Sequence, residues 1–455
     1  MHASIGLRVP FRYALVNGWY FNATPIPSPR LLARVLWHGR ARAVRTLYNA
    51  LVRVGRDPAA ADRAVLAGLY LAWRDEQLPR YRALAATAET QAETADRRRL
   101  VALVDELGCE AGIALWFLAI VGGSAWKMEA CLTRFARQHL TEALPDADGG
   151  AQVLLRGLPG TRYTPAPYAV HSIDWYHPLA GELPAATASG SDRHAGIAAL
   201  REAAEQRCTA ALADRPELAA QFQQLLRVNQ RYAEIRETQA RELTLAWPAL
   251  RTCTHRLGRH LADAAVIDQP DDVYFCTHDE LLTALTEPDR SLTATIAERR
   301  HQWQRQRRLA APLTLGRPPR LIGDVIARAV AQARGAPVTG DAVIVGHPAS
   351  AGRATGPVHI VQGPQDFATF TDGAVLVAKA TAPAWTPLFG RAAAVVTDGG
   401  TFAAHASLIA REYGIPAVVG TADATHRLTS GRLVTVDGTA GVVILHPEQD
   451  GQHLA

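Results

Sequence analysis

The stretch at residues 395–420 constrains the fold most, because it sets one histidine at a junction between a strand and a helix. The apolar run at residues 392–396 predicts a buried strand, a double glycine predicts a turn, and His405 then begins a short helix that ends at Gly414. The first turn of a helix has free backbone N–H groups and the positive end of the helix dipole, so it favours an anion. A phosphorylated imidazole is such an anion, and His405 is therefore the first candidate catalytic residue.

Three segments around this histidine resemble the swivelling phosphohistidine domain of the phosphoenolpyruvate-utilising (PEP-utilising) enzymes, in particular its rifampin phosphotransferase branch. They are residues 381–389, the histidine segment itself and residues 411–420. The resemblance implies that His405 carries a phosphoryl group between a nucleotide site and an acceptor site. Thr397 keeps its place in the family pattern and, with Arg411, is a candidate phosphate-binding residue, while an ion pair on the helix surface is the structural alternative for Arg411.

The histidine segment differs from the family pattern at two positions. Thr401 takes the place of a glycine, and Ala404 replaces the hydroxyl residue that precedes the histidine. A hydroxyl at that position would orient the imidazole or contact the phosphate, and alanine does neither. His405 is therefore either a working phosphocarrier or a residue that is kept for structure.

Periodicity divides the chain into a helical part and a strand-rich part. Apolar residues recur at spacings of three and four over residues 31–140 and 196–265, which predicts amphipathic helices. After the stretch at residues 333–340, short valine-rich runs alternate with glycines, which predicts strands. The expected fold class is multidomain α plus α/β, with a mainly helical substrate-binding domain at residues 1–335 and, as the resemblance implies, a C-terminal β/β/α swivelling domain at residues 341–455.

The chain opens with a predicted β-hairpin whose turn is Asn17 and Gly18. Similar segments in rifampin phosphotransferase-like proteins follow directly after an ATP-grasp domain, so the resemblance implies that this chain lacks that domain. A Gly-x4-Gly-Lys-Ser/Thr phosphate-binding loop is also missing. We therefore expect this chain to bind no cofactor itself, and we expect ATP and Mg²⁺ to be handled by a separate ATP-grasp protein.

Local signals predict where single elements begin and end. A helix is expected to follow Asp214, with Pro216 just inside it, and to run toward Leu261. Residues 273–276 are expected to form a short strand, and Thr277 is expected to cap the helix after it.

A second group of candidate catalytic residues lies in an irregular, proline-rich segment. Two histidines and two carboxylates occur within twelve residues: His171, Asp174, His177 and Glu182. Side chains of these types can move protons, so they predict an acid/base cluster, and histidine-rich loops of the family belong to the acceptor site. Capping of helices and turns is the alternative, and a metal site is not expected because no further ligand run stands out.

Arg236 and Arg241 are candidate phosphate-binding residues. Their segment resembles the arginine-bearing helix that faces the swivelling domain in this family, and guanidinium groups suit a transferred phosphoryl group. A solvated helix face, with ion pairs to Glu237 and Glu242, is the alternative.

Composition limits the class of protein and its partners. The chain has 455 residues and 48% hydrophobic content, and its formal charge of +5 comes from arginines spread along helices, so no nucleic-acid partner is expected. Five widely spaced cysteines without a CxxC pair fit a reducing cytoplasm. The apolar run at residues 111–121 is too short to span a bilayer, and no membrane partner is expected.

The sequence thus predicts a phosphotransferase component that passes a phosphoryl group through His405 to a hydroxyl of a small organic molecule, such as a specialised metabolite. One alternative is a dehydratase or other lyase of a hydroxylated metabolite, in which His405 serves as acid or base or acts through a transient phosphate ester. Another alternative is a non-catalytic binding protein with an inherited fold.

Overall fold

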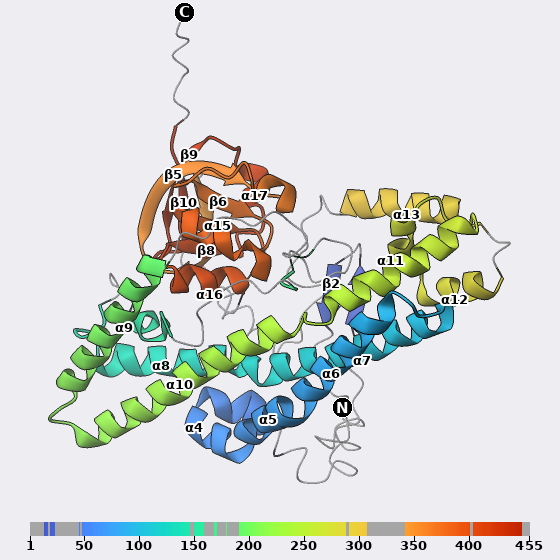
Figure 1. The fold of residues 1–455 in the computed structure, drawn as a ribbon. Helices are drawn as coiled ribbons and strands as arrows, with labels where there is room; N and C mark the ends of the chain where they lie inside the picture. Colours follow the sequence, from blue (N-terminus) through green and yellow to red (C-terminus); the bar gives the residue numbers. More distant parts are fainter. Residues whose placement is uncertain are drawn as a thin grey trace, which may run out of the picture.

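The computed structural model describes residues 13–16, 19–22, 45, 48–145, 150–158, 168–170, 179, 191–287, 291–306, 342–400 and 404–447. Within these ranges a helical body extends to Gln306, and a sheet with short helices begins at Val343 (Figure 1). This order confirms the predicted fold class. The predicted domain boundary, at residues 335–341, lies outside the described residues.

The N-terminal hairpin is confirmed. Strands β1 (Tyr13–Val16) and β2 (Trp19–Asn22) pair antiparallel, with Val16 opposite Trp19.

The helical body packs around one large apolar core. Trp73, Tyr81 and Tyr232 are among its largest fully buried side chains. Its helices are α4 (Pro58–Ala61), α5 (Ala67–Ala72), α6 (Leu78–Ala92), α7 (Arg97–Ile120), α8 (Ala125–His139), α9 (Ser191–Ala211), α10 (Pro216–Glu242), α11 (Trp247–Asp263), α12 (His278–Thr286) and α13 (Thr293–Gln306). Short turns of 3₁₀ or π helix connect or extend them: η1 (Tyr48–Val52), η2 (Arg53–Gly55), η3 (Asp62–Leu66), η4 (Trp73–Gln77), η5 (Gly122–Ser124), η7 (Gly150–Leu155) and η10 (Pro270–Phe275).

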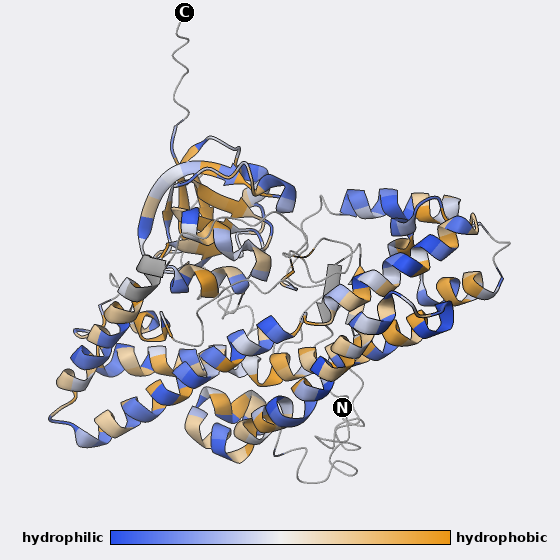
Figure 2. Ribbon diagram, in the orientation of Figure 1, coloured by the Kyte–Doolittle hydropathy of each residue, from blue (hydrophilic) through white to orange (hydrophobic). Residues whose placement is uncertain are grey.

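Helix α7 is the apolar centre of this body. Together with α8 it forms a stretch, Arg97–His139, whose length and composition alone would allow it to cross a membrane. A core helix of a soluble protein meets the same criterion, and Leu100, Leu103 and Leu107 are fully buried against the rest of the body. Figure 2 shows the apolar residues gathered along this helix and in the sheet, whereas α10 and α13 carry more polar ones.

Three local predictions need correction. The helix that begins at Pro216 ends at Glu242, and α11 is a separate helix, so the predicted run toward Leu261 is broken by a turn. Its N-cap is Arg215, which makes no side-chain cap, and Asp214 does not cap it. The predicted strand at residues 273–276 is the 3₁₀ helix η10, whose first residue is proline.

The C-terminal module is built on an eight-stranded sheet in the order β3-β10-β9-β5-β6-β7-β8-β4. Strands β5, β6, β7 and β8 run parallel to one another, and the remaining pairs are antiparallel. The strands are β3 (Val343–Val345), β4 (His347–Ser350), β5 (Arg353–Ile360), β6 (Val375–Ala378), β7 (Ala394–Thr397), β8 (Ala417–Val419), β9 (Leu433–Asp437) and β10 (Val442–Leu445). The short helices are η11 (Pro364–Asp366), η12 (Pro383–Trp385), α15 (Thr386–Arg391), α16 (His405–Glu412) and α17 (Ala424–Arg427).

Apolar side chains cover both faces of the sheet. On one face α15 and α16 bury Phe389, Ile409 and their neighbours, and on the other face Val434 and Val443 lie in a second cluster. This burial fixes α16, whose opposite side faces the helical body beside α8 and α10 (Figure 1).

Candidate phosphohistidine site

The chain presents His405 at the start of a helix, as the sequence predicts. It is the first residue of α16 and follows Ala404, whose backbone is extended and whose side chain makes no cap. The turn before it passes through Gly400 with a φ of 120°, which L side chains rarely adopt, so glycine is needed there. With no side-chain oxygen at the cap position, the first-turn N–H groups are not used for capping and suit an anion.

A threonine hydroxyl holds the imidazole ring in place. Thr381 Oγ1 lies 2.9 Å from His405 Nδ1, and the ring of Phe389 packs edge-on against the imidazole with 5.9 Å between centroids. A hydroxyl therefore orients this ring although Ala404 cannot, because Thr381 supplies it from a distant part of the module. Thr381 lies in the motif at residues 381–389, but the sequence alone did not reveal this role.

The other ring nitrogen has no partner. His405 Nε2 is sealed from solvent and makes no hydrogen bond in the described part of the chain. Burial, aided by the nearby positive charge of Arg236, lowers the pKa of His405 to about 3. The ring is therefore neutral at physiological pH, and its free lone pair can lie on Nε2.

Arg236 comes from α10, in the helical body. Its guanidinium makes no hydrogen bond to a described residue, and burial, followed by the charge of Arg411, lowers its pKa although Glu237 and Glu129 oppose that shift. Gly122 lets α10 come close, since a Cβ on Gly122 would lie 3.3 Å from the Arg236 Cα and 2.9 Å from Gln239 Oε1. The structure thus brings Arg236 to His405, as the sequence predicts for a phosphate-binding arginine.

The seam between module and body is fastened by polar contacts on either side of His405. Both carboxylate oxygens of Glu129, on α8, accept from Arg411 Nη1 at 3.1 Å, and Glu412 Oε2 accepts from the Gly157 N–H at 2.9 Å. At a third point the Ala384 N–H donates to the Val170 carbonyl. The module is therefore docked, with His405 against the helical body.

Positive charge is concentrated at this seam. The Arg156 guanidinium is buried there, with Nε and Nη2 lacking hydrogen-bond partners in the described structure, and burial together with the charge of Arg411 lowers its pKa to about 10. The charge of Arg411 likewise lowers the pKa of Arg236. An anion at the seam would offset this repulsion.

Other predicted phosphate-binding residues have different neighbours. Thr397 Oγ1 donates to the Gly399 carbonyl, which stabilises the turn after β7. Arg411 is buried, pairs with Glu129 of the helical body across the seam and donates to the Ala349 carbonyl, so it is not the surface residue that the structural alternative expects. Arg241 lies beside Glu242, with Nε and Oε1 3.9 Å apart.

The predicted acid/base cluster, His171, Asp174, His177 and Glu182, lies outside the described residues. Its flanks are described, since Val170 forms a β-bridge with Leu179. Because Val170 also bonds to Ala384, close in sequence to the Thr381 that holds His405, the segment begins next to the histidine site.

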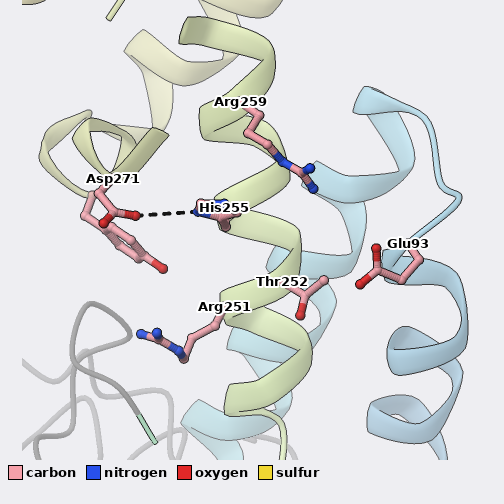
Figure 3. Close-up of a pocket in the computed structure, with 7 residues that line it drawn as sticks. Glu93, Arg251, Thr252, His255, Arg259 and Asp271 are labelled. Atoms are coloured by element: carbon pink, nitrogen blue, oxygen red, sulfur yellow. Dashed lines mark ion pairs between the residues drawn. The ribbon is translucent and has the colours of Figure 1, made fainter. Parts of the chain in front are cut away.

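A separate cavity of about 280 Å³ opens on the helical body. It is lined by Arg251, His255 and Arg259 of α11 together with Glu93, Thr252, Asp271 and Tyr274 (Figure 3). His255 Nδ1 lies 3.5 Å from Asp271 Oδ1, and both side chains are largely exposed. Since α11 extends away from α16, this cavity does not include His405 (Figure 1).

The described residues contain no group of three or more His, Cys, Asp or Glu side chains placed to hold a metal ion. All five cysteines carry free thiols.

Comparisons with known proteins match the C-terminal module and a part of the body. Residues 370–441 match the family model described as "PEP-utilising enzyme, mobile domain". An uncharacterized phosphotransferase of Bacillus subtilis, YvkC, is 40% identical over 192 residues, which cover 41% of this chain and 22% of that protein. Phosphoenolpyruvate synthase of Aeropyrum pernix is 50% identical over 105 residues (23% and 13%), and rifampicin phosphotransferase of Bacillus subtilis is 31% identical over 194 residues (41% and 20%).

The chain thus spans less than a quarter of the length of these relatives. The matched family model includes the turn, the histidine and the helix described above. Two of the relatives are named as phosphotransferases and one as a phosphoenolpyruvate synthase. The C-terminal module, which carries His405 at the start of α16, thus matches the mobile domain of PEP-utilising enzymes.

Proposed function

We propose that this protein transfers a phosphoryl group through His405 to a hydroxyl of a small organic molecule. One observation carries the proposal: the imidazole is held at Nδ1 by Thr381, its Nε2 makes no hydrogen bond to a described residue, and the charge of Arg236 acts on the ring. The tautomer that makes Nε2 nucleophilic has its proton on Nδ1 and donates it to Thr381 Oγ1.

The docked arrangement suits the second half of such a transfer. The phosphoryl group on Nε2 would meet the Arg236 guanidinium, which stabilises the negative charge that spreads over its oxygens. The neutral imidazole is a good leaving group because its low pKa disfavours protonation. The acceptor would bind between α10 and the module, next to the segment that carries His171 and Asp174.

The nucleotide chemistry is assigned to a separate ATP-grasp protein that holds ATP and Mg²⁺. His405 Nε2 is sealed in the docked state, so the module must leave the body to receive the phosphoryl group. Free thiols at all five cysteines suit a reducing compartment, and we place the reaction in the cytoplasm. The acceptor is expected to be a specialised metabolite with a free hydroxyl; rifampicin is the one named for the Bacillus relative.

Elimination of water is the second candidate function. A group that acts as an acid must carry a proton at the working pH, and a pKa of about 3 leaves His405 neutral. This favours a nucleophile or a base over an acid, so in a dehydration His405 would act as the base or through a transient phosphate ester.

Phosphorylation of the protein tests the proposal directly. Potassium phosphoramidate, a small phosphoryl donor, is expected to give an acid-labile, base-stable phosphate on the full chain, located at His405 by mass spectrometry and missing from His405→Ala. A neighbouring ATP-grasp protein with ATP is expected to give the same adduct. Phosphate on another residue, or none, would refute phosphotransfer through His405.

A further inference from the structure

Glu237 is a second ionisable side chain on α10 that the site leaves unused. Its Oε1 is sealed from solvent and accepts no hydrogen bond in the described part of the chain. The charges of Arg236 and Arg241 act on this carboxyl, but neither supplies a hydrogen bond to its Oε1. A buried carboxyl oxygen without a donor is costly, so a partner that the structure does not contain is expected there.

Helix geometry sets Glu237 on the same face as Arg236. Residues 233, 236, 237 and 240 lie at positions i, i+3, i+4 and i+7 of α10, which share one side of a helix. Ala233 and Ala240 are the other two members of this face. Two small side chains thus flank the charged pair.

The charges around Glu237 suit a group that takes up a proton. Burial raises its pKa, while Arg236 and Arg241 oppose that shift. A carboxylate whose pKa is raised is a stronger base than one in water, and the two arginines favour its ionised form.

We propose that Glu237 is the general base that accepts the proton of the acceptor's hydroxyl, which makes the acceptor a neutral alcohol. The inference rests on phosphotransfer through His405. The alcohol oxygen forms the new P–O bond as the P–Nε2 bond breaks, the hydroxyl proton passes to the Glu237 carboxylate, and the imidazole leaves neutral with its proton on Nδ1. Arg236, one position earlier on the helix, balances the charge of the phosphoryl oxygens during this step.

The experiment separates the charging of His405 from the transfer. The full chain and Glu237→Gln are phosphorylated with phosphoramidate, freed of reagent, and mixed with glycerol as a probe alcohol. The decay of phosphohistidine to glycerol phosphate and orthophosphate is followed by ³¹P NMR between pH 6 and pH 9. Glu217→Gln, an exposed position in the first turn of α10, is the matched control.

The expected result is that Glu237→Gln takes up phosphate as the unchanged chain does but loses it at least about 100-fold more slowly, the usual size of a general-base effect. The unchanged chain should transfer more slowly as the pH falls, whereas Glu237→Gln should show no such dependence, and Glu237→Asp should restore part of the rate. Equal decay rates, or equal pH dependence, would overturn the role of Glu237 while phosphotransfer stands. A full chain that takes up no phosphate on His405 would overturn both.

Discussion

The hydroxyl of Thr381 replaces the one that the cap position lacks. It lies 2.9 Å from His405 Nδ1, where a hydroxyl can accept the Nδ1 proton, and in the proposed reaction this contact supports the tautomer with a lone pair on Nε2. A neutral hydrogen bond of this kind contributes about 1 kcal/mol, so Thr381→Val is expected to slow phosphorylation of His405 by about fivefold. In ¹⁵N NMR spectra the proton should move from Nδ1 toward Nε2, and Thr381→Ser should keep both the rate and the tautomer. An unchanged tautomer in Thr381→Val would contradict this role.

His405 also makes the protein sensitive to acid. Burial, with Arg236, lowers its pKa to about 3 in the docked fold, whereas the unfolded chain binds the proton near pH 6.5. The native state therefore loses stability as the pH falls below 6.5, by up to about 1.4 kcal/mol per pH unit, until the pH approaches 3. Urea unfolding at pH 7, 6 and 5 should show a shallower loss for His405→Gln than for the unchanged chain. Parallel losses in both proteins would show that another group is responsible.

At the scale of elements, the close approach of α10 to η5 depends on Gly122. A Cβ there would lie 2.9 Å from both Gln239 Oε1 and Leu118 Cδ1, in a part of the body that is already filled. Gly122→Ala is expected to lower the free energy of unfolding by about 1–3 kcal/mol and to displace Arg236 from His405. The neighbouring Gly123→Ala is the control, because its nearest atom would be 3.7 Å away. Similar midpoints in denaturant for the two variants would contradict this packing argument.

Much of the element order could be predicted from local patterns, since valine-rich runs bounded by glycine mark the buried strands of the module. Strand β4 (His347–Ser350) was not predicted, because its proline and polar residues show no alternation of apolar and polar side chains. The strand predicted at residues 273–276 was wrong, because these β-prone residues follow a proline that starts the 3₁₀ helix at residues 270–275.

The candidate site could be predicted only in part, because some of its contacts join residues that are far apart in the sequence. His405 and Arg236 stand in recognisable motifs, so the sequence identified both. The contact of Thr381 with His405 joins residues 24 positions apart, and the pair of Glu129 with Arg411 joins residues 282 positions apart. The first contact follows from how the module folds and the second from how it docks, and neither can be read from a local pattern of residues.

For the whole molecule, docking depends on one buried ion pair. The side chains of Arg411 and Glu129 are only 5% and 16% exposed, so removing one charge leaves the other buried without its partner. In Glu129→Gln the docked state is expected to lose about 3–5 kcal/mol relative to the open one. The module itself should stay folded, because Arg411 keeps its bond to the Ala349 carbonyl and its sheet is untouched.

Loss of this ion pair should affect the two steps of the reaction in opposite directions. Since docking seals His405 Nε2, opening the seam should speed the labelling of His405 by phosphoramidate while it slows transfer from the charged histidine to glycerol. Small-angle X-ray scattering should show a larger radius of gyration for Glu129→Gln. Glu106→Gln, which removes an exposed pair with Arg99, is the control and should change none of the three measurements, because an exposed pair contributes at most about 1 kcal/mol. If Glu129→Gln labels no faster than this control, the ion pair does not hold the module closed, and the docked state must depend on the other contacts of the seam, Glu412 with Gly157 and Ala384 with Val170.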